Sequence, residues 1–293
     1  MADSHTRHRI TVDYIVLGYT VFTSILFLFF PDRVLSRIEW LAFNAVVIVL
    51  VIAAGRIDPC SEIRWVRILR RYYPVILFTF YYEQTGSLIH IFHDSWFDYQ
   101  IVAFENALFG FQPALSVEHI YNPIMNEIII GCYVSYYIWL PVGLIWLLIK
   151  KMEGEADKLL LSASITFFIS YAMFFFYPVE GPRHFLTGEF SSFMDGYLFV
   201  PIVNEIMRNA AVHGGAMPSS HTAVALIVLI FVWRHSKTVR IPLSLVFVGL
   251  MAGCVWGRFH YLSDVIVGVL LAVVVCYFVE SRFFLPKDQT DKC

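Results

Sequence analysis

The chain has 293 residues, of which 58% are hydrophobic, 17% aromatic and only 15% charged. Soluble domains carry charged side chains at about a quarter of their positions, so this composition excludes an ordinary soluble protein. The formal net charge of −2 identifies no partner by itself, and we expect none among nucleic acids. The five cysteines are scattered, without the spacing of a disulfide framework or a metal site, so we expect no cofactor and no metal.

Apolar runs that can cross a bilayer recur along the whole chain. A spanning helix needs about 20 residues. The first run ends in Pro31-Asp32-Arg33 instead of the small residues that suit cleavage, so we interpret it as a retained anchor and not as a secretory signal. The sequence therefore predicts an all-α polytopic bundle of about eight transmembrane helices, near residues 12–30, 38–54, 72–91, 123–149, 157–177, 218–234, 239–256 and 261–281.

Basic residues are unevenly divided among the segments that connect these runs. If the N-terminus is cytoplasmic, 16 of the 21 Lys and Arg residues fall in cytoplasmic segments, a distribution that the positive-inside rule favours. Residues 92–122 contain no Lys or Arg, which fits an external loop. We therefore expect both termini in the cytoplasm.

Polar side chains are few in the N-terminal half. Glu83 and His90 lie two helical turns apart, so they share a face of the predicted 72–91 helix. They form either an interhelical hydrogen bond or one wall of a head-group pocket, to which Glu127 can also belong. Residues 97–111 mix aromatic side chains with Asp98 and Glu105, which favours an interfacial helix on the outer surface over a further span.

Three polar segments follow in the C-terminal half, and the parity of the predicted spans brings all three to the outer face. They are 177–184 (YPVEGPRH), 218–221 (PSSH) and 258–264 (RFHYLSD). Taken singly, a histidine here is more often an interfacial anchor, Ser-Ser a helix cap and an arginine a snorkelling side chain. Ionisable groups so near hydrocarbon are costly, however, and their gathering on one face favours function.

These residue types together support phosphoryl transfer. Asp264 lies four residues after His260, hence on the same helical face, where it can fix the tautomer that leaves the other ring nitrogen nucleophilic. His221 can protonate the leaving oxygen. A helix start and two guanidinium groups would bind the phosphate, and His184 would border the head group. The expected phosphate-binding residues are Arg183, Ser219, Ser220 and Arg258.

The segments 218–223 (PSSHTA) and 257–264 (GRFHYLSD) resemble the second and third motifs of the type 2 phosphatidic acid phosphatase (PAP2) superfamily, PSGH and SR-x5-H-x3-D. The resemblance covers residues 178–275. It implies that His260 is the nucleophile, Asp264 its orienting partner and His221 the general acid, in a reaction that uses no metal.

Departures from the family's motifs bear on the type of reaction. Phe176 stands where the first motif, K-x6-RP, has lysine, and His184 replaces its proline. Ser220 replaces the glycine of the second motif. Cys254 stands where the third motif has arginine, and Arg258, four residues later, would substitute from the same helical face. With these departures the chain resembles the inositol phosphorylceramide synthase branch of head-group transferases.

We therefore predict a lipid phosphotransferase that takes a phospholipid donor and passes its phospho-head group to a hydroxylated lipid acceptor on the extracytoplasmic face. A phosphodiester carries about one negative charge and a phosphomonoester up to two, so the missing lysine harms diester chemistry less. Two alternatives stay open: hydrolysis of phosphatidic acid or an isoprenyl phosphate by water and, in another class, a transporter or channel. The predicted organisation is N-terminal helices in 1–122, a catalytic membrane core in 123–285 and a cytoplasmic tail in 286–293.

Overall fold

The computed structural model describes residues 4–34, 36–57 and 63–283. Within them the predicted all-α fold is confirmed, because β pairing is limited to an isolated bridge between Val179 and Gly215. The predicted tail 286–293 lies outside the described residues, as do Cys60 and Cys293, and the other three cysteines are free thiols. In chain order, with η for 3-10 helices, the elements are α1 (Ser4–Phe29), η1 (Pro31–Arg33), α2 (Arg37–Ala54), α3 (Arg64–Gly86), α4 (Asp98–Phe109), α5 (Pro113–Ser116), η2 (Val117–Ile120), α6 (Pro123–Val134), α7 (Tyr136–Ile149), α8 (Glu153–Phe176), α9 (Pro182–Phe185), α10 (Phe199–Asn209), α11 (Ser220–His235), α12 (Arg240–Trp256) and α13 (Leu262–Phe283).

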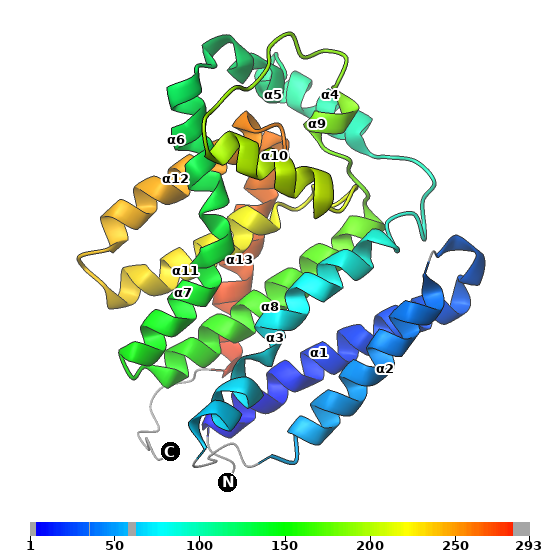
Figure 1. The fold of residues 1–293 in the computed structure, drawn as a ribbon, viewed down its shortest axis with the longest axis vertical. Coiled ribbons are helices and arrows are strands. Elements are labelled where there is room, and N and C mark those ends of the chain that lie inside the picture. Colours follow the sequence, from blue (N-terminus) through cyan, green and yellow to red (C-terminus); the bar gives the residue numbers. More distant parts are fainter. Residues whose placement is uncertain (1–3, 35, 58–62, 284–293) are drawn as a thin grey trace.

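Helix α8 lies at the centre of the bundle, and α2 lies at its edge. Of the apolar window of α8, 72% is buried inside the protein, against 17% for α2. Helix α8 contacts α1, α3, α7, α11 and α13, whereas α2 pairs with α1 as a hairpin on one side of the molecule (Figure 1). The exposed face of α2 is apolar, which is the pattern of a helix that faces lipid.

Helices α11 and α13, which carry the second and third polar segments, pack against each other. Their close approach depends on Gly268 of α13, because a Cβ atom there would lie 2.5 Å from the Ser219 carbonyl oxygen. This contact places the first turn of α11 beside the start of α13.

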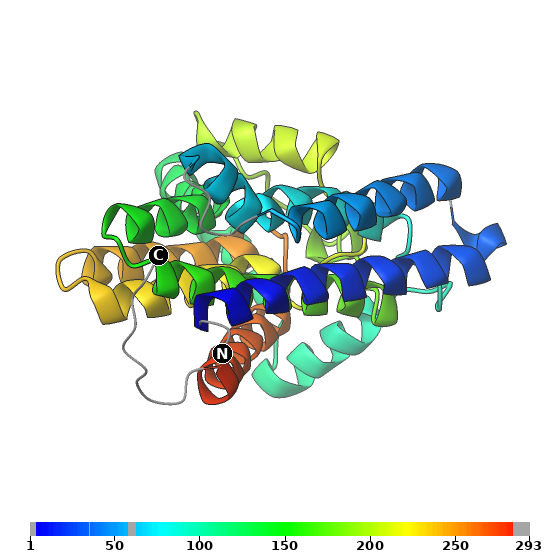
Figure 2. The ribbon, with the colours of Figure 1, turned by 90° about the horizontal axis from the view of Figure 1, so that it is seen from below.

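The short helices α4, α5, α9 and α10 gather at one end of the bundle. The described beginning of α1 and the end of α13 lie at the opposite end (Figure 1), and the view from below separates α4 and α10 to either side of the long helices (Figure 2). The helix expected over residues 97–111 is confirmed as α4. The chain thus builds a cap of short helices over the loops that carry the polar segments.

The number of membrane spans stays a prediction at eight. Among the described residues, α1, α2, α8 and α13 are long and apolar enough to cross a membrane, and α6 with α7 makes a fifth candidate that is bent by 46°. Helices α11 and α12 are apolar but shorter. Helix α3 is long enough, but its first two turns carry four arginines, which keeps its hydropathy low. The apolar helices agree with an integral membrane protein.

One sequence expectation about α3 is wrong. The helix ends at Gly86, not at residue 91, so His90 lies beyond it in the turn that leads to α4. Glu83 and His90 therefore share no helical face. Both side chains are exposed.

Candidate active site

The two histidines of the PSSH and RFHYLSD segments lie side by side. His221 is in the first turn of α11, where Ser219 is the N-cap and accepts a hydrogen bond from the Thr222 N–H at 3.3 Å. His260 lies in the turn between α12 and α13. The His260 Nε2 atom is 3.4 Å from His221 Nδ1, and the ring centroids are 5.4 Å apart. The packing of α11 on α13 therefore creates a histidine pair.

One contact determines where the protons of the neutral pair lie. His260 Nδ1 is 2.8 Å from the Ala216 carbonyl oxygen, which can only accept, so Nδ1 carries the proton. The Nε2 atom of His260 then holds a free lone pair that accepts from His221 Nδ1–H. His221 Nε2 in turn accepts from the Tyr133 hydroxyl at 3.2 Å. The result is one ring whose Nε2 atom is unprotonated, next to a second ring that holds a proton on Nδ1.

Asp264 is close to His260, as the spacing predicts. Its Oδ2 atom is 3.6 Å from His260 Nδ1 and accepts the backbone N–H of Tyr261 at 2.8 Å. The Asp264 side chain is fully buried, and its Oδ1 atom has no hydrogen-bond partner among the described residues. The Ala216 oxygen is the nearer acceptor of the Nδ1 proton, and the Asp264 carboxylate lies beside it as a second, more distant acceptor.

The start of α11 is only partly available to an anion. The Ser219 N–H donates to the Asp264 carbonyl oxygen at 3.0 Å, and the Ser219 hydroxyl is occupied by the cap and by Thr222. Ser219 is therefore a buried cap, the structural role that its position most often has. The backbone N–H groups of Ser220 and His221 lie beyond the cap, at the positive end of the helix dipole.

Arg183 is connected to the histidine pair through two aromatic rings. Its guanidinium donates to Asn204 Oδ1 at 3.3 Å and lies over the Phe259 ring, 5.9 Å from the centroid. Phe259 stacks on Tyr133 at 4.5 Å, and Tyr133 stacks on His221 at 5.0 Å. Arg183 thus belongs to the layer of side chains that borders His221.

The Arg258 side chain contacts residues other than the histidine pair. The expectation that Arg258 lies on the helical face of Cys254 is wrong. Helix α12 ends at Trp256, and Arg258 has a left-handed φ of +63° in the following turn. Its guanidinium donates to Glu118 Oε2 at 3.3 Å and to the Ser192 carbonyl oxygen at 2.6 Å. Cys254, at the position of the motif's arginine, is fully buried against Ser219 and Thr222. Arg258 thus connects the loop before α13 to η2 and to the loop at Ser192.

Asp98 organises the site although nothing in the motifs identifies it. This fully buried carboxylate accepts the backbone N–H groups of Glu180 and Gly181, both at 2.8 Å, and the Tyr261 hydroxyl at 2.9 Å. Gly181 has a φ of +94°, and a Cβ atom there would lie 3.0 Å from the Phe259 carbonyl oxygen. Asp98 therefore joins the segment before Arg183 to the turn that carries His260.

Glu105, two helical turns further along α4, supports the third segment in the same way. Its Oε1 atom accepts the backbone N–H and the hydroxyl of Ser263, at 2.7 and 2.9 Å, in the first turn of α13. Both acids of α4 thus serve as buried acceptors, not as solvated groups of an interfacial helix. The acids were visible in the sequence, but their partners lie more than 80 residues away.

A cavity of about 400 Å³ adjoins the histidine pair inside the bundle. Ser220 and His221 contribute part of its wall, and most of the remaining lining is aromatic or aliphatic side chains of α3, α7, α8 and the end of α10. The volume falls in the range of about 300–1,000 Å³ that is usual for small-molecule sites. Such a cavity suits a lipid chain better than a polar solute.

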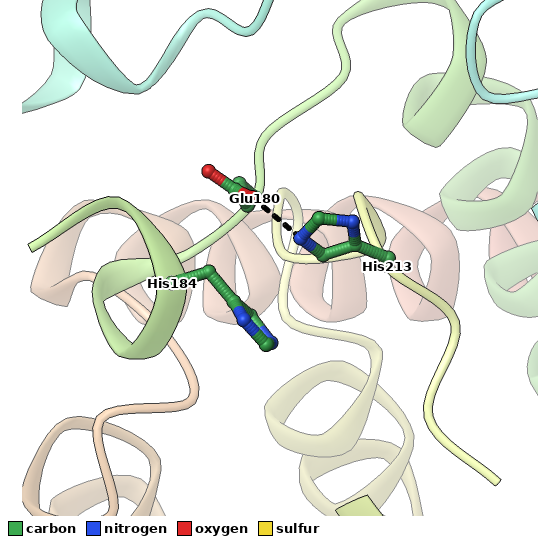
Figure 3. A group of neighbouring side chains, drawn as sticks. All are labelled: Glu180, His184 and His213. Atoms are coloured by element: carbon green, nitrogen blue, oxygen red, sulfur yellow. Dashed lines mark ion pairs between the residues drawn. The ribbon is translucent and has the colours of Figure 1, made fainter. Parts of the chain in front are cut away.

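The remaining candidate residues occupy other places. Glu127 caps α10, where its carboxylate accepts the four backbone N–H groups of residues 197–200. His90 packs against Trp96 at a ring distance of 4.4 Å. His184 of α9 lies next to Glu180 and His213, as Figure 3 shows. None of these side chains lines the described cavity.

The comparison with protein families agrees with this geometry. A family model described as the PAP2 superfamily matches residues 99–278, more than half of the chain. The match runs from α4 into α13, so it includes all three polar segments, the histidine pair and the cavity wall on α11. The comparison with curated proteins and the comparison with solved structures gave no match. The chain belongs to the PAP2 superfamily, whose members are generally enzymes with phosphatase or phosphotransferase activity.

Proposed function

We propose that this protein is a metal-independent lipid phosphotransferase that moves a phospho-head group from a phospholipid to a hydroxylated lipid through a phosphohistidine. The observation that carries the proposal is the His260–His221 pair at 3.4 Å beside an apolar cavity of about 400 Å³. The pair supplies a nucleophile and a proton, and the cavity accommodates a lipid chain next to them. A transporter or channel needs neither the fixed tautomers nor the buried Asp264 charge.

The proposed reaction has two balanced steps. First, His260 Nε2 attacks phosphorus, the bond from phosphorus to the donor's alcohol oxygen breaks, and His221 Nδ1–H protonates that oxygen. The second step follows the first in reverse, with the acceptor lipid in place of the donor's alcohol. The acceptor hydroxyl gives its proton to His221, its oxygen bonds to phosphorus, and the bond to His260 Nε2 breaks. Throughout the first step the imidazolium charge that develops on His260 is stabilised by Asp264.

Phosphate binding falls chiefly to Arg183 and to the N–H groups of Ser220 and His221. Arg183 supplies a cation within the aromatic layer next to His221, and the helix start supplies positive dipole. We keep Arg258 as a supporting residue, because its charge is largely compensated by Glu118 at 3.3 Å. Ser219 contributes by holding the helix start in place.

The proposed phosphate site has little positive charge, because Arg183 is its main cation. This supports transfer from a phosphodiester over hydrolysis of a phosphomonoester. Phe176, at the position of the family's lysine, stacks on Phe92 at a ring distance of 5.0 Å, so this position is apolar. A phosphomonoester brings up to about two negative charges and needs more compensation than a diester. The cavity also favours a lipid acceptor, because a hydroxylated lipid reaches phosphorus from the apolar side while water is kept scarce.

The membrane arrangement is part of the proposal. The excess of Lys and Arg in one set of connecting segments supports cytoplasmic termini. The short helices α4, α5, α9 and α10 gather at the end of the bundle away from the described beginning of α1. With this orientation the histidine pair faces the extracytoplasmic leaflet, from which both lipids would enter.

The test uses purified protein in vesicles that contain a phosphodiester lipid labelled in its head group, with ceramide or diacylglycerol as acceptor. We expect the labelled phosphate to appear on the acceptor lipid and phosphatidic acid to be a poor substrate. His260→Gln, which preserves side-chain size, is the matched control and should give no product. If free phosphate from phosphatidic acid or an isoprenyl phosphate dominates with every acceptor, the protein is a phosphatase. If no lipid is turned over, the proposed enzymatic function is contradicted and the transporter alternative is favoured.

A further inference from the structure

A second group of titratable side chains lies at the outer loops, separate from the histidine pair. Glu180, His184 and His213 place one ligand atom each within 4.8 Å of one another (Figure 3). His213 Nε2 is 2.5 Å from Glu180 Oε1, and the ring centroids of His184 and His213 are 4.6 Å apart. The residues come from the loop after α8, from α9 and from the loop before α11.

We propose that Glu180, His184 and His213 form a binding site for a divalent transition-metal ion of the zinc class. Two imidazoles and one carboxylate are a ligand set that such ions use, with water completing the coordination. This inference concerns a site outside the proposed reaction and does not depend on it.

The observed spacing is close to what coordination requires. Ligand atoms about 2.0–2.1 Å from a tetrahedral ion lie roughly 3.3 Å from each other. The Glu180–His213 contact must therefore open by less than about 1 Å, and the other separations, which are within 4.8 Å, must close by at most about 1.5 Å. Rotations of exposed histidine side chains provide both movements. The His213 side chain is 50% exposed, so an ion can enter from solvent.

The backbone that carries these ligands is already held in place. The N–H of Glu180 donates to the buried carboxylate of Asp98, and the Ala216 N–H donates to the Val179 carbonyl oxygen at 3.2 Å. Trp96 packs against the His213 ring at 5.0 Å. The ion would therefore complete a connection between two preformed loops, and little conformational entropy is lost on binding.

Metal at this site would link two parts of the histidine site. Arg183 lies between Glu180 and His184 in the sequence, and the loop of His213 leads to Ala216, whose carbonyl oxygen holds His260. The ion acts as a structural clip on the active-site loops. It takes no part in bond making, because neither His221 nor His260 is among its ligands.

The test measures Zn²⁺ binding by calorimetry on tag-free, chelator-treated protein in detergent, with His93→Ala as the matched control. We expect one equivalent of tight Zn²⁺, at least tenfold weaker binding in Glu180→Gln and in His213→Ala, and wild-type binding in His93→Ala. Zn²⁺ should also raise the thermal unfolding midpoint of wild type but not of Glu180→Gln, since binding to the native state stabilises it. Equal Zn²⁺ affinity in wild type and Glu180→Gln would overturn the proposal. Neither readout requires turnover, so the outcome is independent of the proposed reaction.

Discussion

Replacing Asp98 tests whether a residue outside the motifs holds the active-site loops together. Asp98→Asn keeps the size of the side chain but turns one acceptor oxygen into an NH₂ donor. The carboxylate has three partners, the N–H groups of Glu180 and Gly181 and the Tyr261 hydroxyl, all at 2.8–2.9 Å in a fully buried place. At least one of these donors then faces another donor.

The magnitude follows from hydrogen-bond energetics. A hydrogen bond to a charged acceptor contributes about 1.5–3 kcal/mol, and a buried donor without a partner costs about 1–3 kcal/mol. We therefore expect Asp98→Asn to lower the free energy of unfolding by about 3–5 kcal/mol. Tyr261→Phe, which removes only one donor, should cost about 1–2 kcal/mol, and the double variant should be less destabilised than the sum because the two residues share a contact.

The assay is equilibrium unfolding in mixed detergent micelles, with lipid turnover measured on the same preparations. Asp94→Asn is the matched control, because the Asp94 side chain is 84% exposed and pairs with Arg33 only at the surface. It should change stability by less than about 1 kcal/mol. Turnover of Asp98→Asn should fall more than its folded fraction, because the loop before Arg183 loses its support. Wild-type stability and turnover in Asp98→Asn would refute this reasoning.

Three further predictions follow from the site. Asp264→Asn should lower turnover by on the order of 100-fold and leave donor binding nearly unchanged, because the Ala216 oxygen still holds the His260 proton while the imidazolium loses its counter-charge; single-turnover kinetics would check this. Burial alone would raise the pKa of Glu118, but hydrogen bonds from the loop at residues 191 and 192 and the Arg258 charge lower it overall from its ordinary 4.5. The stabilisation is therefore present above pH 4.5 and lost as pH falls through the depressed pKa, so unfolding midpoints of wild type and Glu118→Gln should differ at pH 7 and converge in acid. Excess EDTA should leave most of the turnover of Glu180→Gln, which lacks one ligand of the proposed Zn²⁺ site, whereas complete loss that one divalent ion restores in this variant would contradict metal-independent transfer.

The helices and the histidine pair were predictable because both depend on short-range patterns. Apolar runs of about 20 residues identify membrane helices, and the segments PSSH and RFHYLSD each contain their own helix start. The described residues form an all-α fold as predicted, and the side chains of Asp264 and His260 lie 3.6 Å apart, which a spacing of four residues predicts.

What the sequence could not predict depends on contacts between distant segments. Asp98 and Glu105 are ordinary acids in an aromatic stretch until folding places the starts of other segments against them. Arg258 was expected on the helical face of Cys254 because it lies four residues later, yet α12 ends at Trp256, with Gly257 as its C-cap. The Glu180 and His213 ligands are likewise separated by α10, so no local spacing reveals them.

The most direct test of the central claim is to identify the residue that carries the phosphoryl group. Wild-type protein would be mixed with a donor lipid labelled at phosphorus, without acceptor, quenched in base and mapped by mass spectrometry. We predict an acid-labile phosphohistidine at His260 that disappears on addition of acceptor lipid and is absent from His260→Gln. Label on a different residue, or head-group transfer at the wild-type rate by His260→Gln, would contradict the mechanism.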